Sequence, residues 1–189
     1  MARWVSRLLN PSILAVIECL VVGFLLGTLT GWLWILFVLS LTTLIPVLYI
    51  ANLSRRGHVT DFDVFIRQQR NKPYIFIGIC SAVALSIIII FKAPWILVFL
   101  CVVAFIQTSI MFVINRFWKI SAHTASSASF SIITWQLLGP LGLLTFIIIP
   151  IIAWSRVKLH RHSLAQVIMG AFTGALIYFL AFVFFYAKP

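Results

Sequence analysis

Long uninterrupted runs of apolar residues restrict the folds that are open to this sequence. A helix needs about 20 apolar residues to cross the hydrocarbon core of a bilayer. Several runs approach that length in a chain that is 63% hydrophobic and 9% charged. The sequence therefore predicts an all-α, polytopic transmembrane helix bundle with six to seven spans, formed as a single integral membrane domain over residues 1–189. The expected spans are Ser12–Gly27, Gly31–Asn52, Tyr74–Phe91, Trp95–Asn115, Thr124–Gly139, Leu141–Trp154 and Leu164–Tyr186.

Three of the connections between these runs are polar and basic, and they cover residues 53–73, 116–123 and 155–163. Two expected spans separate the first connection from the second, and two more separate the second from the third. An even number of crossings returns a chain to the same side of the bilayer. We therefore expect all three connections to face one compartment.

Positive charge gathers at the same three connections and at the N-terminus. The chain has 14 Lys and Arg against 3 Asp and Glu, a net charge of +11, and of these cations only Lys92 and Lys188 fall on the other expected side. The positive-inside rule therefore places the polar side in the cytoplasm. The expected fold leaves no soluble surface that could bind nucleic acid. The expected partners are the lipid bilayer and a membrane lipid substrate that carries phosphate.

The third polar connection contains a pattern that is typical of phosphate chemistry. Ser155 and Arg156 precede His162 by a short loop, and Gln166 follows one helical turn later. The planar guanidinium of arginine suits phosphate oxygens, and a neutral imidazole can attack phosphorus. At four residues' distance, Gln166 can hydrogen-bond the ring of His162 and orient it.

The second polar connection ends in Ser121, Ala122 and His123, directly before an expected span. Ser121 is a plausible N-cap, and the backbone N–H groups that follow an N-cap form an anion site. We expect His123 to lie beside the bound anion, where it can give a proton to a leaving oxygen.

The first polar connection contributes further positive charge through Arg67, Arg70 and Lys72. The two arginines are three residues apart and share a face if this segment is helical. They are expected to bind phosphate, with Asp61 and Asp63 as side chains that could hold them in place.

Together these clusters resemble the three-part signature of the type 2 phosphatidic acid phosphatase superfamily of membrane lipid phosphatases. The signature reads Lys, six residues, Arg-Pro; then Pro-Ser-Gly-His; then Ser-Arg, five residues, His, three residues, Asp. The third part matches at Ser155, Arg156 and His162, with Gln166 in place of the aspartate.

The second part of the signature matches at Ser121 and His123, and the first part matches loosely at Arg70. Arg67 or Lys72 could supply the cation that the first part lacks. The residues that depart from these two parts are Asp63, Asn71, Ile120 and Ala122. The resemblance covers residues 53–187.

The resemblance implies an integral membrane phosphatase that hydrolyses phosphatidate or a polyprenyl phosphate or diphosphate without metal or other cofactor. It implies that His162 attacks phosphorus to form a phosphohistidine and that His123 serves as acid and then base. Arg156, Arg70 and the N–H groups of residues 121–123, with Ser155, would then bind the phosphoryl oxygens.

Two alternatives to a hydrolase remain open from the sequence. The same residues would serve a phosphotransferase that passes the phosphoryl group to an alcohol. The neutral Gln166 would also suit a membrane protein that binds phosphorylated lipids without turnover. The resemblance further implies an extracytoplasmic or lumenal site for many relatives, whereas the charge distribution favours the cytoplasm.

Overall fold

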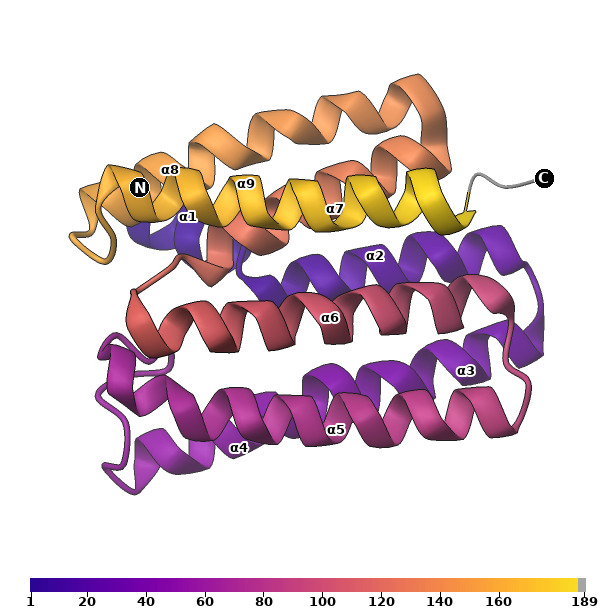
Figure 1. The fold of residues 1–189 in the computed structure, drawn as a ribbon, viewed down its shortest axis with the longest axis horizontal. Helices are drawn as coiled ribbons and strands as arrows, with labels where there is room; N and C mark the ends of the chain where they lie inside the picture. Colours follow the sequence, from indigo (N-terminus) through magenta and orange to yellow (C-terminus); the bar gives the residue numbers. More distant parts are fainter. Residues whose placement is uncertain (187–189) are drawn as a thin grey trace. The chain divides into compact units, whose positions relative to one another are not determined.

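All regular secondary structure in residues 1–186, the part of the chain that the computed structural model describes, is helical (Figure 1). The all-α fold with several membrane-spanning helices is therefore confirmed. Two residues used in the sequence predictions, Ala187 and Lys188, lie outside the described residues. In chain order the elements are α1 (Ala2–Leu8), α2 (Pro11–Leu26), α3 (Leu29–Leu39), η1 (Ser40–Leu44), α4 (Ile45–Arg55), η2 (Arg67–Arg70), α5 (Asn71–Ile90), α6 (Trp95–Phe117), α7 (Ala122–Leu138), η3 (Gly139–Ile147), α8 (Ile148–Lys158), α9 (Leu164–Ala181) and η4 (Phe182–Tyr186).

Within residues 1–186, five helical stretches are long and apolar enough to cross a membrane, and α1 with α2, bent by 44°, makes a sixth if the pair counts as one span. The protein is therefore an integral membrane protein by the length and composition of its helices. The five stretches are Leu29–Arg55, Arg67–Ile90, Trp95–Phe117, Ala122–Lys158 and Leu164–Phe185.

The stretch Ala122–Lys158 contains two of the seven runs expected from the sequence, joined without a break in helical structure. Its backbone reverses at Gly139, so that α8 runs back along α7 (Figure 1). Gly139 has φ of 61°, in the left-handed region that glycine tolerates best. The hydroxyls of Thr134 and Thr145 then meet at 2.8 Å across the reversal.

The described chain divides into two compact units: one contains Met1–Glu18 with Lys119–Pro189, and the other contains Cys19–Trp118. We call them the histidine unit and the arginine unit, after the predicted site residues that each contains. The expectation of a single membrane domain over residues 1–189 stays a prediction.

In the arginine unit, apolar side chains fill the space between the helices. Val38 of α3, Ile88 of α5 and Ala93 form a buried cluster. The chain turns sharply after α5 because Lys92 adopts φ of 53°, which lets the Ala93 N–H reach the Ile88 carbonyl at 2.9 Å. This is a Schellman motif, a common way to end a helix.

In the histidine unit, α7 and α9 pack together through small residues. A Cβ atom added at Gly170 would lie 2.5 Å from the Ser121 carbonyl oxygen, and one added at Gly174 would collide with the Ala125 carbonyl. Only glycine permits the two backbones to approach so closely. This contact holds the first turn of α7 against α9, and α1 packs against α8 in the same unit.

Candidate functional site

The candidate site is built around the N-terminus of α9, where Ser163 and Gln166 form a capping box. The Ser163 side chain accepts the Gln166 N–H, and the Gln166 side chain accepts the Ser163 N–H at 3.2 Å. This reciprocal pair satisfies two backbone donors that a helix start otherwise leaves open. The Ser-x-x-Gln pattern of a capping box is visible in the sequence.

The same Gln166 side chain fixes the proton on the ring of His162. Its Oε1 accepts the Ser163 N–H and lies 3.1 Å from His162 Nδ1. An amide oxygen can only accept, so the contact is a hydrogen bond only if Nδ1 carries the proton. The neutral ring then has its lone pair on Nε2. The predicted orientation of His162 by Gln166 is thus present, and it is combined with helix capping.

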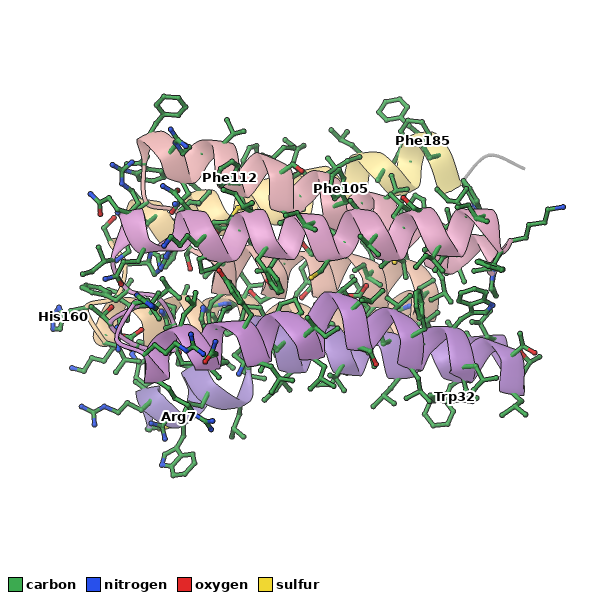
Figure 2. All side chains as sticks on the ribbon, turned by 90° about the horizontal axis from the view of Figure 1, so that it is seen from below. Arg7, Trp32, Phe105, Phe112, His160 and Phe185 are labelled. Atoms are coloured by element: carbon green, nitrogen blue, oxygen red, sulfur yellow. The ribbon has the colours of Figure 1, made fainter. Side chains whose placement is uncertain are left out.

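His162 itself is 6% exposed, and a Schellman motif at the end of α8 sets its position. His160 takes φ of 52°, its N–H reaches the Val157 carbonyl, and the N–H groups of Arg161 and His162 converge on the Arg156 carbonyl at 3.0 and 3.4 Å. His160 points away from the helices (Figure 2). The loop therefore turns one histidine inward and the other outward.

Arg156 is the largest side chain that is almost completely buried, at 1% exposed. Its Nη1 donates to the hydroxyl of Ser6, on α1, at 2.6 Å. The neighbouring Ser155 is also buried, and its hydroxyl has no hydrogen-bond partner among the described residues. A buried polar group of this kind is expected to meet a polar ligand or a water molecule.

The second predicted cluster lies at the same end of the histidine unit as His162. Ser121 is the N-cap of α7, as expected, and its hydroxyl accepts the Thr124 N–H at 3.4 Å. The Ser121 N–H donates to the Gln166 carbonyl at 3.3 Å. His123, two residues further on, is 7% exposed. Two histidine motifs that are distant in the sequence are therefore joined through Ser121 and Gln166.

A second contact joins the chain before α7 to the loop before α9. Lys119 Nζ donates to the Arg161 carbonyl at 2.8 Å. A lysine that bridges to a loop carbonyl holds the chain before α7 against the loop before α9. Ala122, predicted to offer its backbone N–H to phosphate, begins α7 and is partly buried.

The predicted phosphate-binding residues of the first cluster belong to the arginine unit. Arg67 Nη1 donates to the Asn115 and Arg116 carbonyls at 3.2 and 2.6 Å, and Arg70 Nε donates to the Val64 carbonyl at 2.8 Å. Lys72 is exposed in the first turn of α5. Arg67 and Arg70 thus contact backbone carbonyls, and binding of phosphate by these three residues stays a prediction.

Nothing in the sequence indicates a role for Ser6, because its partner Arg156 is 150 residues away and a serine near the N-terminus has no distinctive pattern. The Ser121 cap and the Gln166 contact, in contrast, were local and predictable. Comparison with family models, with curated proteins and with solved structures finds no match to this chain.

Proposed function

We propose that this protein is an integral membrane lipid phosphatase in which His162 is the nucleophile and His123 the acid and base. The observation that carries the proposal is the hydrogen bond between Gln166 Oε1 and His162 Nδ1, which leaves the Nε2 lone pair for attack. A buried arginine, Arg156, precedes His162 near the end of α8, and its carbonyl accepts the His162 N–H at 3.4 Å. Imidazole nucleophiles need this kind of orienting partner.

The reaction proceeds in two balanced steps. His162 Nε2 attacks phosphorus as the ester P–O bond breaks, and the leaving lipid oxygen takes a proton from His123. Water then attacks the phosphohistidine, gives a proton back to His123, and the P–N bond breaks to release phosphate. Arg156, Ser155 and the first N–H groups of α7 are placed in the proposal as donors to the phosphoryl oxygens, whose charge rises in the transition state.

A phosphorylated lipid is the proposed substrate class because the site residues lie at one end of long apolar helices. A lipid can keep its acyl or polyprenyl chain in the bilayer while its phosphate reaches that end. The net charge of +11 favours an anionic head group. Phosphatidate and polyprenyl phosphate or diphosphate remain the candidates within that class, in accordance with the resemblance.

The proposed topology has several crossings, with the site on the cytoplasmic side according to the charge distribution and on the opposite side according to the resemblance. A reporter fused after Pro189, combined with labelling of a cysteine introduced at the exposed His160, distinguishes the two orientations in intact cells or spheroplasts. His160 is suited to this because it is exposed beside the proposed site.

The test of function is phosphate release by purified protein from phosphatidate and from polyprenyl phosphate, in detergent with a metal chelator present. We expect turnover by the wild type and a loss of about 10³-fold or more in His162→Asn, since the nucleophile is removed. His160→Asn is the matched control because its exposed side chain points away and Asn tolerates its left-handed backbone.

Two results would change the assignment. Transfer of phosphate to an added alcohol in preference to water would identify the protein as a phosphotransferase. Tight binding of the lipid with equal, background-level release in wild type and His162→Asn would identify a non-catalytic lipid-binding protein.

A further inference from the structure

The N-terminal helix α1 contacts the proposed site through Ser6. Ser6 is 5% exposed, and its hydroxyl accepts a hydrogen bond from Arg156 Nη1 at 2.6 Å. Charge-assisted hydrogen bonds of this length are among the stronger polar contacts in proteins. Arg156 is itself 1% exposed, so this contact is shielded from water, which strengthens it.

Ser6 is the buried residue of α1. Arg3, Trp4 and Arg7 are exposed, and Figure 2 shows Arg7 pointing outward. Arg and Trp at a helix surface are typical of the lipid head-group region. A break separates α1 from α2, where Asn10 Oδ1 accepts the Ile13 N–H at 2.9 Å. α1 is thus a separate element that packs against α8.

We propose that Ser6 is a positioning residue of the phosphate site, which holds the guanidinium plane of Arg156 in the orientation that binds phosphoryl oxygens. A guanidinium presents five N–H groups in one plane, and a fixed acceptor on one Nη determines how that plane is rotated. A side chain with several rotatable bonds is then restricted to one geometry before substrate arrives. This inference rests on the proposed phosphatase function and adds to it a residue from the opposite end of the chain.

The first experiment measures inhibition by orthovanadate, a mimic of the phosphoryl transition state, together with kcat/KM for phosphatidate. In Ser6→Ala we expect the vanadate inhibition constant to rise about tenfold and kcat/KM to fall about tenfold, as for loss of a hydrogen bond to a charged group. Ser129→Ala is the matched control. Ser129 is also 5% exposed, but its hydroxyl donates to the Ala125 carbonyl of its own helix.

Ser6→Thr and Ser6→Val have side chains of equal shape, so comparing them distinguishes a positioning role of the Ser6 hydroxyl from a merely structural role of the side chain. Ser6→Thr keeps the hydroxyl and should retain most of the vanadate affinity, whereas Ser6→Val lacks it and should behave as Ser6→Ala does. A merely structural role for Ser6 would affect both variants equally. The inference is overturned if Ser6→Thr and Ser6→Val have equal vanadate inhibition constants, or if Ser6→Ala and Ser129→Ala do. The proposed phosphatase function of the wild type would stand in either case.

A double variant tests whether Ser6 acts through Arg156. In an Arg156→Lys background, which lacks the planar fork, Ser6→Ala should cause little further loss of vanadate affinity. A full additional tenfold loss would show that Ser6 acts independently and would overturn the inference. A wild type that neither hydrolyses lipid nor responds to vanadate would overturn the proposed function, and this inference with it.

Discussion

Arginine side chains are held differently in the two units. In the arginine unit, Arg67 and Arg70 donate to main-chain carbonyls, and the Arg67 contacts lie at the C-terminus of α6, where a helix leaves its last carbonyls open. In the histidine unit, Arg156 donates to a side-chain hydroxyl, Ser6, from another element. The first arrangement stabilises loops and helix ends. The second joins α8 to α1 through a buried guanidinium.

The two units also differ in how closely their helix backbones approach. Each has a buried apolar cluster, Val38, Ile88 and Ala93 in the arginine unit and Leu14, Phe130 and Ile152 in the histidine unit. In the histidine unit, small residues additionally let the backbones of α7 and α9 come into close contact. This contact lies in the unit that holds both histidine motifs.

The largest expected effect concerns Arg156 compared with Arg67. We expect Arg156→Ala to lower kcat/KM by about 10²–10³, because a preorganised donor to the transition state is lost. Arg67→Ala should instead lower the stability of the protein in detergent by about 1–3 kcal/mol, because two carbonyls lose a charged donor. Phosphate-release kinetics and thermal unfolding measure the two losses. An equal loss of kcat/KM in both variants would break the comparison and support the sequence prediction that Arg67 binds phosphate.

The next effect concerns the close contact between α7 and α9. Gly174→Ala adds a Cβ against the Ala125 backbone, so the helices must separate, and overpacking of this kind costs about 1–3 kcal/mol. Gly78→Ala, on α5 in the arginine unit, is the matched control because no atom lies within 4 Å of its added Cβ. Thermal unfolding in detergent measures both. Identical midpoints would mean that the helix contact tolerates an extra methyl group.

The smallest effect concerns the charge beside the nucleophile. Gln166→Glu places a carboxylate next to His162, which favours the protonated ring. The nucleophile must be neutral, so the acidic limb of the pH profile of kcat/KM should move to higher pH by about one unit. Gln69→Glu makes the same charge change in the arginine unit, where the Gln69 side chain accepts the Thr60 N–H, and should leave that limb in place. If the acidic limb of kcat/KM stays in place in Gln166→Glu, protonation of His162 does not determine that limb.

Much of the fold could be predicted because the apolar runs are long and local signals mark their ends. The Ser121 cap of α7 follows from neighbouring residues alone. The reversal at Gly139 between two expected passes follows from its Gly-Pro pair, but the 3-10 segment that continues after this turn could not be predicted. η3 is stabilised there by contacts with α7, such as the one between Thr134 and Thr145.

The candidate site was predictable only where its contacts are short in sequence. The pairing of His162 with Gln166 spans one helical turn, so spacing identified it. The charge of Arg67 is visible in the sequence and predicts phosphate binding, whereas the carbonyls that it contacts, 48 and 49 residues away, carry no local signal. Ser6 was invisible for the same reason. Side chains whose partners are set by tertiary contacts carry no local signal.

The central claim is that His162 carries the phosphoryl group during turnover. The direct measurement is rapid quenching of the protein mixed with phosphatidate labelled in its phosphate, in chelator, followed by peptide mapping at alkaline pH, where a phosphohistidine survives. We predict label on the peptide that contains His162, retained in His160→Asn and absent in His162→Asn. Phosphate release by the wild type with no labelled His162, or label that persists in His162→Asn, would contradict the account.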